Sequence, residues 1–317
     1  MKIAVLEPLG VANEDLAMRI YHAAEDYDGE LEIALSLDRR EDEETLVARA
    51  EGAEIVVVSN IKFPASVMEQ LPDLRYICCA FTGYDHIDME YCAAHGIQVA
   101  NCSGYSTTAV AELVIAFAIN MGRSVLAADK AVRAGGTMAG LVGPELEGKR
   151  VGIIGCGAIG TRVAQLAQAF GCEVIAYNRS VKVVPGVTFT TLEEVMATSD
   201  IITVHVPNNA QTKGMIGAEQ FALCKPSAYF INCARGPIVD SQALADALNE
   251  DRLAAAAVDV YEMEPPIPAD HPLLNCKNLL ATPHIAFATD QAWEKRADII
   301  AQNVASWLAG DPINLVK

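Results

Sequence analysis

The sequence predicts an α/β protein with two doubly wound parallel sheets. Short apolar runs alternate with helical patterns from end to end, which implies parallel strands joined by helices that cover both faces of a sheet. Hydrophobic residues make up 52% of the chain and are mainly alanine, valine and isoleucine, as expected for helices packed on buried parallel strands. The 317 residues suffice for two such domains.

A first series of strands lies in the N-terminal third, with helical patterns at Asn13–Ala24 and Glu43–Glu51. Strands alternating with helices of this length indicate one α/β domain. The expected strands are Ile3–Leu6, Leu31–Ala34, Ile55–Val58, Tyr76–Cys79 and Gln98–Ala100.

A second series starts at Val151, and its six strands match the size of one doubly wound nucleotide domain. A long helical region, Thr107–Ala134, separates the two series, and a final helix is expected at Asp290–Leu308. The proline-rich segment Glu262–Pro272 is expected to be a surface loop. The strands are Val151–Ile154, Glu173–Tyr177, Ile201–Val204, Ala228–Asn232, Ala255–Val258 and Leu279–Ala281.

Charge and composition exclude several classes of partner. The formal net charge of −18 leaves no basic field to displace counterions from nucleic acid or an anionic membrane, although one arginine in a pocket would still bind a small anion. Nine cysteines without a Cys-x-x-Cys pair indicate a reduced protein with no disulfide framework and no metal site. No signal-peptide pattern and no apolar run of about 18 residues occurs, so we expect a cytoplasmic protein.

A glycine-rich turn, VGIIGCGAIG, fits the pattern G-x-G-x-x-G between an apolar strand and a helix. Gly155 would permit the tight turn, Gly157 the approach of a pyrophosphate, and Gly160 the close packing of helix on strand. The helix start, at Ala158 and Ile159, would offer N–H groups to the phosphates. A tight turn that binds no ligand is the alternative.

The residues after the next strand favour NADP(H). A carboxylate at this point would accept hydrogen bonds from the ribose hydroxyls of NAD, but the chain has Asn178, Arg179 and Ser180. An amide, a cation and a hydroxyl would bind a 2′-phosphate, which a carboxylate would repel. If Arg179 instead points into solvent, NAD(H) remains usable with less selectivity.

Seven longer segments, each occurring once, are spread over most of the chain. They are FTGYDHID at 81–88, NCSGYSTTAVAEL at 101–113, GPELEGKRVGIIGCGAIG at 143–160, HVPNNAQTKGMIG at 205–217, NCARGPIVDSQAL at 232–244, VDVYEMEPP at 258–266 and TPHIAFAT at 282–289. In sequence and order they resemble the D-isomer-specific 2-hydroxyacid dehydrogenase family. Residues 1–74 resemble that family only in their strand–helix pattern.

The resemblance implies a flavodoxin-like substrate-binding domain with a Rossmann nucleotide-binding domain inserted into it. We place the first at residues 1–100 plus 286–317 and the second at residues 101–285. In this family the active site lies in the cleft between the domains. The resemblance also implies a homodimer formed through the nucleotide domains and the long helix at Thr107–Ala134.

The family's catalytic set falls on Arg235, Glu264 and His284. Reduction of a 2-oxo acid needs a hydride on C2, which the nicotinamide supplies, and a proton on the carbonyl oxygen. His284 would donate that proton, Glu264 would favour the imidazolium form, and Arg235 would bind the substrate carboxylate and polarise the carbonyl. Singly, they could be a core histidine, a solvated loop acid, and a helix cap or a partner of Asp240.

The resemblance assigns further contacts. Backbone N–H groups of Thr82 and Gly83 would bind the substrate carboxylate, and Phe287, where many members have glycine, could narrow the pocket. Asp259 would accept from the nicotinamide carboxamide, or could be a helix-cap or loop acid. The remaining cofactor contacts would come from Thr107, Val206, Pro207, Thr212, Cys233 and Ala234.

The predicted function is the reversible reduction of a small 2-oxo acid to its D-2-hydroxy acid, with NADP preferred and NAD usable. Glyoxylate and hydroxypyruvate are the leading substrates. One alternative is a phosphoglycerate-type dehydrogenase, and another is a non-catalytic NAD(P) sensor on the same fold. A formate-type dehydrogenase is disfavoured because that branch lacks a glutamate where this chain has Glu264.

Overall fold

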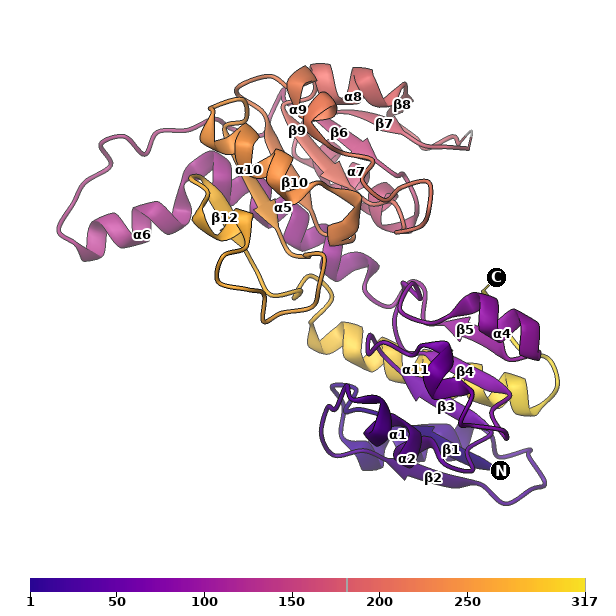
Figure 1. Ribbon diagram of the computed structural model, residues 1–317. Coiled ribbons are helices and arrows are strands. Elements are labelled where there is room, and N and C mark those ends of the chain that lie inside the picture. The colour runs from indigo at the N-terminus through magenta and orange to yellow at the C-terminus, as the bar shows by residue number, and fades with distance from the viewer. Residues whose placement is uncertain (181, 317) are drawn as a thin grey trace. The chain divides into compact units, whose positions relative to one another are not determined.

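The computed structural model describes residues 1–180 and 182–316, and the chain forms two compact units (Figure 1). Unit 1 comprises Met1–Ser106 and the segment from Ala288 onward, and unit 2 comprises Thr107–Phe287. The domain boundaries expected from the sequence lie after residues 100 and 285. The turn that follows the last strand of unit 1 stays with that unit, and the turn that contains His284 stays with unit 2.

Unit 1 holds a five-stranded parallel sheet in the order β2-β1-β3-β4-β5. This is the strand order of flavodoxin-like folds, and every expected strand lies within one residue of its predicted bounds. The strands are β1 (Lys2–Val5), β2 (Glu32–Leu35), β3 (Ile55–Val58), β4 (Tyr76–Cys79) and β5 (Gln98–Asn101). The helices are α1 (Asn13–Ala23), α2 (Glu43–Ala50), α3 (Ala65–Met68), α4 (Met89–His95) and α11 (Asp290–Leu308).

Helix α11 is tied to unit 1 by buried polar side chains. The Arg296 guanidinium, 4% exposed, donates to the carbonyl oxygens of Leu9 at 2.6 Å and Ala80 at 3.4 Å. The Asn303 amide, fully buried, donates to the carbonyl of Asn101 at 3.1 Å. Buried polar groups of this kind need their partners, so the helix has one favourable register against the sheet. Helix α11, near the C-terminus, therefore packs in the same unit as the N-terminal strands.

Unit 2 holds a seven-stranded parallel sheet in the order β12-β11-β10-β9-β6-β7-β8, the Rossmann order extended by one strand. Its strands are β6 (Arg150–Ile154), β7 (Glu173–Tyr177), β8 (Val187–Phe189), β9 (Ile201–Val204), β10 (Tyr229–Asn232), β11 (Ala255–Val258) and β12 (Leu279–Ala281). Its α-helices are α5 (Thr107–Arg123), α6 (Val125–Arg133), α7 (Ala158–Ala169), α8 (Leu192–Thr198), α9 (Ala218–Leu223) and α10 (Ser241–Asn249). Short 3₁₀ helices are η1 (Gly236–Ile238) and η2 (Pro272–Asn275). The predicted fold class is thereby confirmed.

The long helix predicted at Thr107–Ala134 is wrong in one respect, because it breaks at Ser124. Ser124 adopts a left-handed conformation with φ of 50°, and α5 and α6 meet at a bend of 53°. Within the described residues no single helix is long and apolar enough to cross a membrane, and only the bent α5–α6 pair meets the length and composition requirement. Half of α5 is buried in unit 2, whereas α6 has no buried residue.

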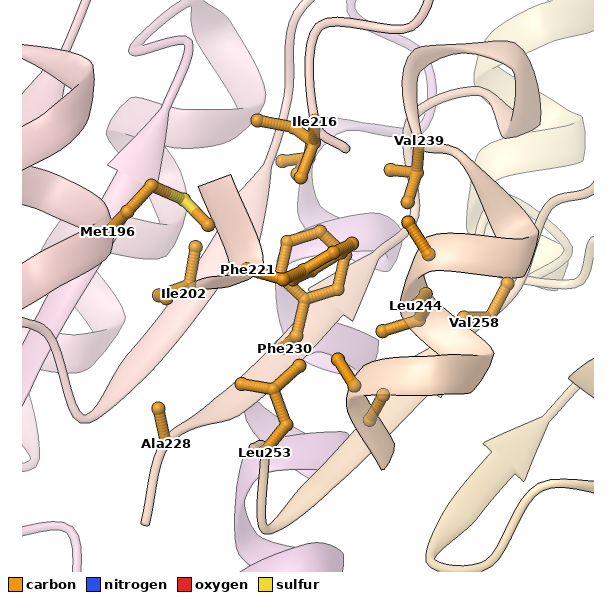
Figure 2. Packing of buried hydrophobic residues seen from close by; sticks show 14 of the residues in the cluster. Met196, Ile202, Ile216, Phe221, Ala228, Phe230, Val239, Leu244, Leu253 and Val258 are labelled. Atoms are coloured by element: carbon orange, nitrogen blue, oxygen red, sulfur yellow. The ribbon is translucent and has the colours of Figure 1, made fainter. Parts of the chain in front are cut away.

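The core of unit 2 forms on both faces of the sheet. Alternate residues of a strand point to opposite faces, so Phe230 packs under α8, α9 and α10 while Ile231 packs under α5 and α7. Figure 2 shows the first of these clusters, in which Phe221 of α9 meets Phe230 edge-on, with ring centroids 5.1 Å apart. This double burial fixes the sheet and therefore the positions at which its strands end.

Removing the Phe221 ring tests this core. Phe221→Ala should lower the free energy of unfolding of unit 2 by about 3–5 kcal/mol, since it leaves a cavity against Phe230. Leu223→Ala, on the same helix but 42% exposed, should change it by less than about 0.5 kcal/mol. Urea unfolding followed by circular dichroism measures both, and equal losses for the two variants would contradict the packing.

Candidate functional site

The glycine-rich turn joins β6 to α7 and has room above it. Gly155 has φ of +96°, and a Cβ there would lie 2.7 Å from the backbone of His205. A Cβ on Gly160 would lie 2.3 Å from the carbonyl oxygen of Gly155, so this glycine is required for the helix to approach the strand. A Cβ on Gly157 would meet nothing within 4 Å. Gly157 is the N-cap of α7 and no side chain caps this end, which suits an anionic ligand.

The loop after β7 carries the groups expected near a ribose phosphate. The Asn178 amide donates to the carbonyl and the hydroxyl of Ser180 at 2.8 and 3.2 Å, while Arg179 is exposed. Lys182 was not predicted: its ammonium donates to the carbonyl of Cys156 at 2.9 Å, directly at the glycine-rich turn. A second cation shortly after Arg179 was the signal available in the sequence.

Asp259, at the end of β11, organises the turn that contains His284. Its carboxylate accepts from the Thr282 hydroxyl at 2.6 Å and from the N–H groups of Ile285 and Ala286, both at 2.8 Å. Its carbonyl accepts from the N–H of His284 at 2.8 Å. These bonds hold His284 in the left-handed region, with φ of 55°, which a residue with a Cβ rarely adopts.

Asp259 is fully buried. Burial raises the pKa of Asp259, and the hydrogen bonds from Thr282, Ile285 and Ala286 oppose that rise. Burial, reinforced by the charge of Asp259, raises the pKa of the Cys233 thiol well above its usual range, so Cys233 is not a reactive thiolate. The cofactor contact predicted for Asp259 stays a prediction, whereas its role within the turn was not foreseen from the sequence.

His284 and Glu264 form a direct pair. Nδ1 of His284 lies 2.9 Å from each carboxylate oxygen of Glu264, and the two side chains are 10% and 41% exposed. A carboxylate only accepts, so Nδ1 carries a hydrogen and Nε2 is the nitrogen that would exchange a proton with a substrate. The Phe287 ring stands edge-on to the imidazole at 5.3 Å.

Arg235 lies in the turn after β10. The buried side chain of Asn232 accepts from the N–H of Ala234 at 3.0 Å and donates to the carbonyl of Arg235 at 3.1 Å. The guanidinium of Arg235 is half-buried and donates to the carbonyl of Ala234 at 2.8 Å. Asp240, named above as a potential partner of Arg235, caps α10 through the N–H of Ala243.

The predicted residues of unit 2 gather at one edge of its sheet. Arg235, Glu264 and His284 follow the neighbouring strands β10, β11 and β12, and parallel strands all end at the same edge. Most of the residues predicted to bind the cofactor follow β6, β7 and β9 at that edge. There Val206 lies against the glycine-rich turn, and Thr212 donates to the carbonyl of Pro207 at 2.5 Å. Thr107 begins α5, whereas Thr82 and Gly83 follow β4 in unit 1.

A second histidine at this edge cannot act as an acid. Burial lowers the pKa of His205 to about 3, so its ring is neutral at physiological pH. Its Nε2 lies 2.9 Å from the Thr203 hydroxyl oxygen. Unlike His205, His284 has a carboxylate, that of Glu264, within hydrogen-bond distance of its ring.

Comparison with known proteins agrees with this geometry. The family model described as "D-isomer specific 2-hydroxyacid dehydrogenase, NAD binding domain" matches residues 115–286. A glyoxylate reductase of Thermofilum pendens is 37% identical over 260 residues, 79% of this chain and 76% of that protein. A glycerate dehydrogenase of Methylorubrum extorquens is 37% identical over 284 residues, 86% of this chain and 88% of that protein.

Among solved structures, an acyclic imino acid reductase in complex with NADPH and D-Arg has a TM-score of 0.90 and 31% identity, with both chains covered completely. The likeness thus extends over unit 1, where the sequence motifs alone were weakest. The protein belongs to the D-isomer-specific 2-hydroxyacid dehydrogenase family.

Proposed function

We propose that the protein reversibly reduces a small 2-oxo acid to its D-2-hydroxy acid, with NADP(H) as the preferred cofactor. The contact between His284 and Glu264 carries the proposal, because it equips one imidazole to donate and accept a proton at the sheet edge that also holds the glycine-rich turn. The named activities of the relatives, on glyoxylate and glycerate, support a substrate of two or three carbons.

The residues at the sheet edge fit a dinucleotide. Gly157 leaves the space that a pyrophosphate would fill, and the uncapped start of α7 supplies N–H donors. When bound, the cofactor supplies the hydride that C2 of the substrate accepts. We assign the adenine and ribose side to Val206, Pro207 and Thr212, and further contacts to Thr107, Cys233, Ala234 and Asp259.

The side chains of the chain perform the remaining steps. The planar guanidinium of Arg235 binds the substrate carboxylate. Nε2 of His284 donates a proton to the carbonyl oxygen during reduction and removes it during oxidation. Glu264 compensates the positive charge on the imidazolium and fixes the ring so that Nε2 keeps its direction.

The catalytic assignment predicts a graded loss of activity. Oxidation of NADPH, followed by absorbance at about 340 nm, should depend on the presence of a 2-oxo acid. Several small 2-oxo acids are tested, each alone and mixed with an amine, because one solved relative is an imino acid reductase. His284→Asn should lower kcat by about a hundred- to ten-thousandfold, the usual contribution of a general acid. Glu264→Gln should cause a smaller loss. Exposed His22→Asn is the control, and full activity of the His284 variant would contradict the assignment.

The preference for NADP(H) rests on two cations. Arg179 is exposed in the loop after β7, and the Lys182 ammonium lies at the glycine-rich turn. Both are therefore available to a 2′-phosphate, and the loop after β7 offers no carboxylate at residues 178–180 to repel it.

Removing both cations should reverse the preference. The double variant Arg179→Ala with Lys182→Ala should raise the KM for NADPH about tenfold to a hundredfold, the value of one or two charge-assisted hydrogen bonds. The KM for NADH should stay within about twofold. Lys277→Ala, which removes a remote surface cation, is the matched control. Equal changes for both cofactors would remove the basis for the NADP(H) assignment.

We also propose a homodimer formed through α6 and the segment after it. Helix α6 buries none of its residues within the chain, and its Leu126 and Val132 are 51% and 68% exposed. Met138 and Val142, in the following segment, are 73% and 82% exposed. Apolar side chains exposed together mark a surface that a second copy would cover.

Sedimentation velocity tests this surface. The native chain should sediment with twice the mass of one chain, and Val132→Glu should shift it towards the monomer because a charge would be buried at the interface. Met18→Glu, at an equally exposed position on α1 of unit 1, should leave the dimer intact. A native monomer, or the same shift in both variants, would exclude this interface.

A further inference from the structure

A second histidine–carboxylate pair lies beside the first. Nε2 of His271 is 3.0 Å from Glu262, and the two side chains are 6% and 37% exposed. Nδ1 of His271 accepts from the N–H of Leu273 at 3.3 Å. The hydrogen of the neutral ring is therefore on Nε2, and His271 donates to Glu262 without needing to be charged.

Glu262 is held as an ionised acceptor. Burial favours its neutral form, but the hydrogen bonds from Ser241 and His271 outweigh burial and hold the pKa of Glu262 below its ordinary value. The neighbouring Tyr261 ring stands edge-on to His271 at 5.6 Å. The His271–Glu262 pair is thus mostly shielded from solvent and is contacted by Ser241 and Tyr261.

This pair closes a loop that contains Glu264. Glu262 and His271 both lie in the segment that joins β11 to η2, and His271 is its last residue. Their side chains meet, so the part of this segment from residue 262 to residue 271 has fixed ends. Glu264 lies two residues inside it. The Glu264 carboxylate is 41% exposed, so water competes with His284 for its hydrogen bonds. The conformation of the loop backbone therefore decides whether the carboxylate remains bonded to His284.

The base of the loop is also fixed to the turn of Arg235. A Cβ on Gly236 would lie 1.9 Å from the carbonyl carbon of Tyr261 and 2.5 Å from the nitrogen of Glu262. The backbones of residues 236 and 261–262 therefore touch, and only glycine permits this contact. Any movement at Glu262 reaches both Arg235 and Glu264.

We propose that the Glu262–His271 pair is a positioning clamp that holds Glu264 against His284, an inference that rests on the proposed function of His284. Neither residue of the clamp is assigned a contact with substrate or cofactor. The clamp acts through Glu264, because it keeps the loop closed at the point from which that carboxylate extends.

Two readouts separate a clamp from a merely structural contact. The first is the titration of the His284 ring by NMR, which needs no activity. The second is the pH dependence of kcat for reduction. His271→Leu and Glu262→Ala remove the same bond from opposite sides, and His271→Gln keeps a donor to Glu262.

The clamp predicts that both deletion variants titrate His284 at a lower pH than the native chain, because the imidazolium loses part of its counter-charge. The midpoint of the pH profile of kcat for reduction should move to lower pH together with the NMR titration. At the pH optimum kcat should drop about tenfold while KM stays nearly unchanged. His271→Gln should restore most of the loss. In a Glu264→Gln background, His271→Leu should have no further effect, since the clamp acts only through Glu264.

Asp251→Asn, which breaks a surface pair with Lys277 in the same unit, is the matched control and should change neither readout. An unchanged titration of His284 in a folded deletion variant would overturn the clamp, as would full additivity with Glu264→Gln. General unfolding of both deletion variants would also overturn it, since the pair would then belong to the core. A native chain without activity would count against the proposed function alone, because the NMR titration still decides the clamp.

Discussion

The parallel direction of the strands in unit 2 is the constraint on which the site depends. Because all strands of that sheet run the same way, the turns after β6, β7, β9, β10, β11 and β12 reach one edge, although they lie far apart in sequence. Burial on both faces, with Phe230 and Ile231 pointing in opposite directions, fixes where each strand stops. The fold thereby brings the glycine-rich turn, Arg235, Glu264 and His284 to the same edge of the sheet.

Hydrogen bonds within the turns then set the finer geometry. Asp259 holds the turn that contains His284 through four bonds and keeps the histidine in a conformation it would otherwise leave. Glu264 comes from a different loop and meets the ring at 2.9 Å. The buried, neutral His205 and the protonated thiol of Cys233 add no competing acid or nucleophile at this edge. The chemistry is thus concentrated on one imidazole.

Much of this was predictable from local sequence. Strand positions follow from short apolar runs, and Arg235, Glu264 and His284 follow from motifs whose order carries the family. β8 was missed because it is a three-residue edge strand without a buried residue. The break at Ser124 was missed although Gly122 and Ser124 both weaken a helix there, because the apolar pattern continues on either side. Lys182 had a signal in the sequence, its position shortly after Arg179, that was not used. The turn around Asp259 and the Glu262–His271 pair depend on specific side-chain contacts across loops, which no periodicity or spacing predicts.

The most direct test of the account is the pH dependence of the reaction in both directions. If His284 is the single acid and base, kcat/KM for reduction should fall with rising pH while kcat/KM for oxidation rises, each profile with a single midpoint. Glu264→Gln should move that midpoint to lower pH in both directions, since the charged ring loses its counter-charge. Two results would contradict the central role of the His284–Glu264 pair. One is that kcat/KM for reduction and for oxidation change in the same direction with pH, and the other is that Glu264→Gln leaves the midpoint unchanged.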